Sequence, residues 1–408
     1  MRLHRGWLGS LLLLGSAVTT AQSTPNSQDI CQNSPGIGPG ASKYSLWQPD
    51  PLCPILGPVS AANLRLKKAT NLNLKASYTF LYQYATVTPD TRHGQISARL
   101  DFQGDWTAHT RGKDSSSFTM LLRSGTNIGQ SQQWNLSDSL GSILGLNSLQ
   151  GGGAQRPITI NLLYFRQTWA AQRVALYIGK LHPNQHIGLS PVNNDETSQF
   201  LGGPFDGNPS EPRLGTYAPG AAIEIGPPNG FYTHALIVDA EAKPWTGTQT
   251  LFDGHYYESW EVGWKSNMQT EQGRNIRAAV WHNDTKELGR GTGVGIGADW
   301  EFNNGWLPFG RWGINAATGS TTKQVETIGL ANVAPFGRKK ADLFGAASTW
   351  TRPSTPGQRL EELTEFFYRL KLSDSLEFSP DVEWLRHPSI PNKINQTAVL
   401  GVRLKVIF

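Results

Sequence analysis

The chain has 408 residues with a formal net charge of +5, and 16% of its residues are charged. This length suits two ordinary domains or one large β-structure, and the modest charge without a basic tract argues against nucleic acid as a partner. Abundant Gly (44), Trp (14) and Tyr (11) are typical of a β-protein with many turns and a polar surface.

The N-terminus has the pattern of a secretory signal peptide. Arg2 and Arg5 precede an apolar run that begins at Leu11, and the run passes into small residues that end near Ala21. It is far shorter than the roughly 20 residues that a membrane-spanning helix needs. We therefore predict that residues 1–23 are a signal peptide and that the protein is exported.

The two cysteines, Cys31 and Cys53, both follow this signal. Export brings them into an oxidising compartment, where pairing is the default expectation. The sequence therefore predicts a disulfide between them, which would contribute roughly 3 kcal/mol by the loop-entropy relation.

From residue 71 onward, short segments of alternating polar and apolar residues are joined by polar or Gly-rich turns, which is the pattern of β-strands. The predicted strands lie near 72–84, 95–104, 117–123, 157–168, 173–180, 215–226, 230–241, 256–266, 274–282, 293–303, 305–316, 324–334, 341–350, 361–373, 375–387 and 396–408. An even number of strands is typical of single-chain bacterial outer-membrane barrels.

Two connections, residues 125–156 and 182–213, are much longer than the others. Loops of this length are uncommon in compact soluble domains. In an outer-membrane barrel, long outer loops and short periplasmic turns are normal, and a loop can fold inward to narrow the pore.

The two faces of the strands differ in a way that favours a membrane barrel over a soluble β-sandwich. The last strand, 398–408, alternates apolar residues with Gly401, Arg403 and Lys405. We expect its apolar face to meet lipid or a neighbouring subunit, and Arg403 and Lys405 to face the channel. Aromatic residues gather toward segment ends, as they do at the two lipid–water interfaces of membrane barrels. These residues are Tyr82, Tyr84, Trp260, Trp264, Trp300, Trp306, Trp312 and Trp384.

No catalytic constellation is evident. The glycine-rich run 291–298 has dinucleotide-motif spacing but lies inside an alternating strand, so we interpret the match as accidental. His182 and His186 are better explained as loop contacts than as metal ligands, because no third ligand accompanies them. Asp195 and Glu196 are adjacent in sequence and are expected in a solvated turn. We predict no enzyme activity, no metal and no cofactor.

Charged residues on the second face of the strands would project into a water-filled lumen. They are Arg99, Asp101, Arg166, Lys180, Glu224, Arg277, Glu301, Arg311 and Arg369. Any wide barrel needs a polar lining, but interleaved acids and bases near aromatic rings also suit a neutral, polyhydroxylated solute. A strongly anion-selective pore would show a mostly basic lining.

From about Tyr78 to Phe408 the sequence resembles the carbohydrate-selective porins of the OprB family, which are outer-membrane proteins of Gram-negative bacteria. The resemblance rests on "ARLDFQGDW", on the long stretch "LLYFRQTWAAQRVALYIGKLHPNQHIGLSPVNNDETSQFLGG", on "YAPGAAIEI" and on the C-terminal segment. The most specific part is the motif Arg-Leu-x-Leu-x-x-x-Leu-x-Phe-x-Pro-Asp, which begins at Arg369 and runs toward Trp384.

The resemblance implies an all-β fold, a transmembrane antiparallel barrel of about 16 strands over residues 71–408. It implies passive diffusion of monosaccharides such as glucose, with short oligosaccharides as a further class. The alternatives are a general or ion-selective porin and, less favoured, a barrel enzyme. The channel-lining residues that it implies are Arg99, Asp101, Arg123, Arg166, Lys180 and Glu224, with aromatic help from Trp134 or Trp169. Residues 24–70 match nothing in the family and are expected to form a periplasmic extension or a plug.

The expected partners follow from the prediction of an outer-membrane porin. They are outer-membrane lipid and lipopolysaccharide, the sugars themselves, and the outer-membrane assembly machinery, which would recognise the terminal Phe408. The sequence leaves a monomer and a homotrimer equally open, because strands that face lipid and strands that face a neighbouring subunit look alike.

Overall fold

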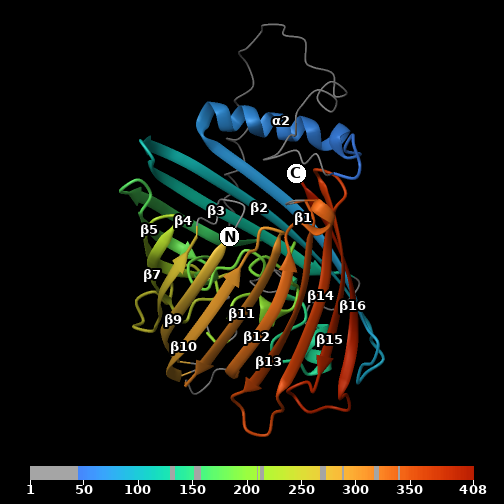
Figure 1. The fold of residues 1–408 in the computed structure, drawn as a ribbon. Helices are drawn as coiled ribbons and strands as arrows, with labels where there is room; N and C mark the ends of the chain where they lie inside the picture. Colours follow the sequence, from blue (N-terminus) through green and yellow to red (C-terminus); the bar gives the residue numbers. More distant parts are fainter. Residues whose placement is uncertain are drawn as a thin grey trace, which may run out of the picture.

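The structure is a computed structural model that describes residues 45–128, 134–150, 158–208, 210–211, 216–266, 273–286, 289–316, 321–338 and 341–408. Its sixteen strands form one closed antiparallel barrel, in which each strand pairs with the next and β16 returns to β1 (Figure 1). The strands are Leu72–Ala85 (β1), Gly94–Arg111 (β2), Asp114–Asn127 (β3), Thr159–Trp169 (β4), Val174–Leu181 (β5), Ala218–Ile225 (β6), Gly230–Asp239 (β7), Tyr256–Lys265 (β8), Arg274–Thr285 (β9), Gly289–Trp300 (β10), Trp306–Asn315 (β11), Thr322–Asn332 (β12), Leu343–Pro353 (β13), Glu361–Lys371 (β14), Leu376–Arg386 (β15) and Gln396–Ile407 (β16).

The predicted fold is confirmed, and each predicted strand overlaps one strand of the structure. The largest difference is β2, which runs to Arg111 instead of ending near 104. Apart from Trp106 and Ala108, its extra residues are polar, and this extension pairs with residues 114–119 of β3. Backbone hydrogen bonds, which the side-chain pattern does not reveal, extend this hairpin.

The barrel has an apolar outer face and a polar inner face. Tyr82, Leu400 and Val402 point outward and are 46%, 48% and 43% exposed, whereas Arg403 points inward and is 2% exposed. The predicted orientation of the last strand is therefore confirmed. Successive residues of a strand point to opposite faces, so the register fixes the direction of every other wall side chain.

One end of the barrel carries the C-terminus and the helix Cys53–Thr70 (α2) (Figure 1). The two longest connections leave the opposite end. We call residues 128–158 the first inward loop and residues 182–217 the second inward loop, because the described residues of both pack against the inner wall. Their apolar side chains form a core inside the barrel with wall residues of β11–β16: Leu136, Leu140, Leu146, Val192, Phe200 and Phe205 meet Leu307, Phe309, Leu363 and Phe367.

The remaining helices are short. They are Leu136–Leu140 (α3) and the 3-10 turns Ser148–Gln150 (η1), Pro183–Gln185 (η2), Gly203–Phe205 (η3) and Pro335–Gly337 (η4). None of the helices in the described ranges is long and apolar enough to cross a membrane.

Helix α2 was not predicted from the sequence. Leu, Ala, Arg and Lys, which are good helix formers, fill its second half, and Asn71 ends it in the left-handed conformation with φ of 59°. The predicted signal peptide, 1–23, and Cys31 lie outside the described residues. The cleavage and the disulfide from Cys31 to Cys53 therefore stay predictions.

Candidate functional site

Glycines on the inner face let large groups lie flat against the wall. A Cβ on Gly293 would collide with the ring of Trp281, and a Cβ on Gly329 would collide with Phe309. At Gly313 the space is taken by Asn208 and Ser210 of the second inward loop. The glycines of the run 291–298 thus leave room on the inner face of β10 for side chains such as Trp281 to pack against the backbone. This structural role agrees with the interpretation of the dinucleotide-motif match as accidental.

Charged wall residues hold the second inward loop by its backbone. Glu365 of β14 accepts hydrogen bonds from the amides of Leu201 and Gly202 at 2.6 and 2.8 Å. Arg403 of β16 donates to the Gln199 carbonyl at 2.8 Å. Fully buried charges need such partners, so this side of the barrel is an anchoring surface.

The same anchoring continues on β8 and β11. Arg311 donates to Asn193 Oδ1 at 2.6 Å and to the Phe205 carbonyl at 3.2 Å. Glu261 accepts from the Gly188 amide at 2.8 Å. Arg311 points inward as the sequence predicted, but it contacts the loop and is only 6% exposed.

A network of two arginines and two carboxylates joins β2 and β3 to the second inward loop. Asp101 Oδ2 accepts from Arg99 Nε at 3.0 Å, and Asp101 Oδ1 accepts from Arg123 Nε at 2.7 Å. Arg99 also forms an ion pair with Glu196 of the loop, and Arg123 Nη1 donates to the Tyr217 hydroxyl at 2.9 Å. We call these five residues the eyelet cluster.

The strand register explains why the eyelet cluster forms. Asp101 lies directly opposite Arg123 in the β2–β3 pairing, and Arg99 is two residues from Asp101 on the same face. The side chain of Asp101 is 17% exposed to solvent and that of Glu196 is 12% exposed, whereas the side chains of both arginines are almost fully buried. The formal charges of the four ionised groups cancel, so the cluster offers water a polar surface without net charge.

A second inward cluster lies on β4–β6. Arg166 Nε donates to the Tyr177 hydroxyl at 3.0 Å, and that hydroxyl donates to Glu224 Oε2 at 3.1 Å. His186 Nδ1 of the second inward loop lies 2.9 Å from Glu224 Oε1. Tyr164 meets the Tyr177 ring edge-on at 5.7 Å. This cluster combines aromatic rings with the charged side chains of Arg166 and Glu224 and the imidazole of His186.

Two residues that the resemblance implied as channel-lining face the other way. Lys180 pairs in register with Leu163, which is 51% exposed on the outer face, and its Nζ donates to two carbonyls of the β7–β8 connection at 2.6 and 2.9 Å. Trp169 has the same orientation as Leu163 on β4 and is 45% exposed. Both expectations are corrected: the alternation of the strand turns these side chains away from the lumen.

Trp134 lies in the first inward loop rather than on the wall. The Arg92 guanidinium lies 5.7 Å from its ring centroid, and the ring packs against the apolar core inside the barrel. Arg92 belongs to the β1–β2 connection, so Trp134 joins two connections at the end of the barrel that lies opposite α2.

Two acidic groups of the second inward loop have strongly altered pKa values. Burial, together with the Glu196 carboxylate, raises the pKa of Asp206 to about 7. Burial and Glu261 raise the pKa of Glu211 to about 8. The charge packed inside the barrel therefore changes near neutral pH.

The described part of the chain holds no group of three or more acidic, His or Cys side chains arranged for a metal ion. The two histidines considered for such a site have separate partners. His182 stacks on Tyr217 with ring centroids 4.3 Å apart, while His186 contacts Glu224.

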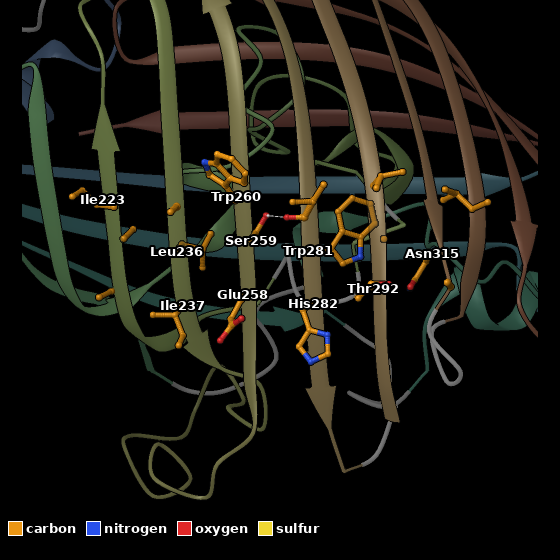
Figure 2. Close-up of a pocket in the computed structure, with 18 of the residues that line it drawn as sticks. Ile223, Leu236, Ile237, Glu258, Ser259, Trp260, Trp281, His282, Thr292 and Asn315 are labelled. Carbon is orange, nitrogen blue, oxygen red and sulfur yellow. Dashed lines mark hydrogen bonds between the residues drawn. The ribbon is translucent and has the colours of Figure 1, made fainter.

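A hollow of about 1010 Å³ lies on the outer face, over β5–β12. Its lining is mostly apolar and includes Ile223, Ile237 and Trp260, which point away from the lumen (Figure 2). This hollow is therefore separate from the eyelet cluster and from the path through the barrel.

The family model for carbohydrate-selective porins of the OprB family matches residues 105–304 and 229–408. The chain belongs to the OprB family of carbohydrate-selective porins. It is thus a channel of the outer membrane and not an enzyme. Because the two longest connections leave the end opposite α2, as extracellular loops do, we infer that the end with α2 is periplasmic.

Solved structures agree on the fold. The high-pH structure of OprB from Pseudomonas putida has a TM-score of 0.71 at 11% identity, covering 90% of this chain and 99% of that chain. The low-pH structure of the same protein has a TM-score of 0.56 at 10% identity and covers 90% of this chain and 100% of that chain. No curated protein matches the sequence.

The sequence did not identify every member of the porin's eyelet cluster. Glu196 was expected in a solvated turn and Tyr217 was not singled out, yet both reach the wall from the second inward loop. The unusual length of this loop was the one available signal, because contacts across the barrel leave no trace in strand periodicity.

Proposed function

We propose that this porin passes neutral monosaccharides such as glucose by passive diffusion along the wall formed by β2–β6, beside the eyelet cluster. The observation that carries the proposal is the charge balance of that cluster, in which Asp101 bridges Arg99 and Arg123 while Glu196 pairs with Arg99. Balanced charges offer hydrogen-bond donors and acceptors without holding a counter-ion, which suits a solute with many hydroxyl groups.

Aromatic side chains on the same wall support a sugar as the solute. Tyr164 and Tyr177 face inward on β4 and β5, and Arg166 and Glu224 lie beside them. Sugar C–H faces stack on aromatic rings while the hydroxyls bond to the charged groups. On β14 and β16, by contrast, Glu365 and Arg403 bind the loop and are almost fully buried, so they are not available to a solute.

The test is the ion current of the purified porin in planar bilayers with glucose added at millimolar concentration. We expect glucose to lower the current, and the Glu224→Gln variant to weaken that effect because one acceptor is lost. Arg290→Gln is the matched control, since Arg290 is an exposed charge on the outer face of β10. If glucose leaves the current of the unmutated protein unchanged while the salt alone sets it, the protein is a general or ion-selective porin.

A further inference from the structure

Helix α2 presents an apolar face that nothing within the described residues covers. Ile55 is 71% exposed and Val59 is 54% exposed, and Ala62 continues the same side of the helix. Their spacing of four and then three residues places them in one stripe. Apolar groups as exposed as these, repeated along one stripe, indicate a surface that meets a non-aqueous partner.

The helix is fixed on the periplasmic rim, in line with the barrel wall. β16 ends opposite Ser77, so the first residues of β1 lack a β16 neighbour on that edge. The Asn63 side chain of α2 replaces this missing strand neighbour. Asn63 Nδ2 donates to the Leu74 carbonyl at 2.5 Å, and the Leu74 amide donates to Asn63 Oδ1 at 3.0 Å. Helix α2 therefore lies above the end of β16.

The segment before the helix is tied to the same rim. The Trp47 amide donates to the Leu372 carbonyl at 2.7 Å, and the Ser375 amide donates to Asp50 Oδ2 at 2.8 Å. Both contacts are made at the β14–β15 turn. Residues 47–70 thus follow the rim from this turn to the start of β1 (Figure 1).

The C-terminal end of α2 lies on the outer side of the rim. Trp106 points outward from β2, and its Nε1 donates to the Thr70 carbonyl at 3.1 Å. The same indole stacks on Phe118, with ring centroids 5.7 Å apart. The helix is therefore continuous with the aromatic, lipid-facing surface of the barrel.

The charge of the helix points to the kind of surface that it meets. Arg65, Lys67 and Lys68 lie in its C-terminal half, and the helix contains no acidic residue. An apolar stripe combined with basic side chains is the composition of helices that lie on anionic lipid surfaces.

We propose that α2 is an interfacial helix that binds the periplasmic leaflet of the outer membrane. The stripe of Ile55, Val59 and Ala62 lies at the boundary between headgroups and acyl chains, and the basic residues contact anionic phospholipid headgroups. The proposal concerns a lipid contact of the N-terminal segment and does not depend on which solute the channel passes.

The test compares two positions of equal exposure on different sides of the helix. Val59 and Leu64 are 54% and 52% exposed, and they are five positions apart in the helix, so they lie about 140° apart around the helix axis. Val59→Cys and Leu64→Cys proteins carry a nitroxide label and are reconstituted, full length, in vesicles with or without phosphatidylglycerol. Oxygen, which enters lipid, and a water-soluble nickel chelate then report the surroundings of each label by electron paramagnetic resonance.

We expect the label at position 59 to gain oxygen relaxation and to lose most of its nickel relaxation in phosphatidylglycerol vesicles, while the label at 64 remains exposed to nickel. Replacing the basic residues together (Arg65→Gln, Lys67→Gln, Lys68→Gln) restores nickel access at 59. Unmutated protein, labelled in parallel, measures any reaction at Cys31 or Cys53, and migration on unheated gels selects folded protein.

Three results would overturn the proposal. A label at 59 that is equally open to nickel in both kinds of vesicle faces water. A label shielded from both reagents faces protein, which includes the barrel itself or a second copy. Equal profiles at 59 and 64 would mean that the stripe has no special orientation.

Discussion

At the scale of single residues, the role that we propose for the eyelet cluster depends on how its charges are shared. Asp101 is the only member that contacts both arginines, because its two oxygens face Arg99 and Arg123 separately. Removing this carboxylate leaves two guanidinium groups with Glu196 as their remaining acidic neighbour in the cluster.

We expect Asp101→Asn to make the channel prefer anions and Arg123→Gln to make it prefer cations, because each variant leaves one uncompensated charge beside the water path. The reversal potential in a KCl gradient should therefore shift in opposite directions for the two variants. Shifts in the same direction, or none, would place the eyelet cluster outside the conducting path.

At the scale of elements, we expect the width of the path to depend on how closely the second inward loop lies against the wall. Gly313 of β11 has no side chain, and Asn208 and Ser210 of the loop occupy the space in front of it. Gly310 lies on the outer face of the same strand and has room for a side chain. The nearest atom to a Cβ at this position would be the Thr327 carbonyl oxygen at 3.6 Å, which is an ordinary contact distance.

Gly313→Val should push the loop toward β2–β6 and lower the single-channel conductance. Forcing a larger side chain into a packed site costs about 1–3 kcal/mol, which a folded barrel can tolerate. Gly310→Val, which changes the outer face, should leave the conductance unchanged. An equal loss in both variants would mean that strand β11, and not the loop, responds to the substitution.

At the scale of the whole molecule, the C-terminus closes the barrel and carries the predicted assembly signal. The Phe408 amide donates to the Ala76 carbonyl at 2.9 Å, next to the β1–β16 seam, and its ring is 38% exposed. One hydrogen bond contributes about 1 kcal/mol, which is too little to decide whether the barrel folds.

Deleting Phe408 should therefore lower the amount of heat-modifiable, folded porin in the outer membrane far more than it lowers the conductance of the molecules that insert. Phe366→Ala removes a 48% exposed aromatic ring from the outer face of β14 and serves as the control. If the two variants reach the membrane equally well, the terminal residue acts only as a lipid-facing aromatic.

The sequence by itself determined the barrel, its sixteen strands and the outward face of clearly alternating strands such as β16, because the alternation of side chains along a strand is a local property. It placed Arg99, Asp101, Arg166 and Glu224 on the inner face correctly. The same reasoning misplaced Lys180, since near the end of a short strand too few alternating residues define the face. Trp169 was placed inward only by the family resemblance, which does not fix the direction of a single side chain.

Only the tertiary structure decided what the inward charges do. Arg311 was predicted to point into the lumen, and it does, but it binds the backbone of the second inward loop instead of water. Likewise Glu196 reaches Arg99 from 97 residues away in sequence. The path of a long loop depends on packing against distant wall positions such as Gly313, and no local pattern of residues encodes that contact.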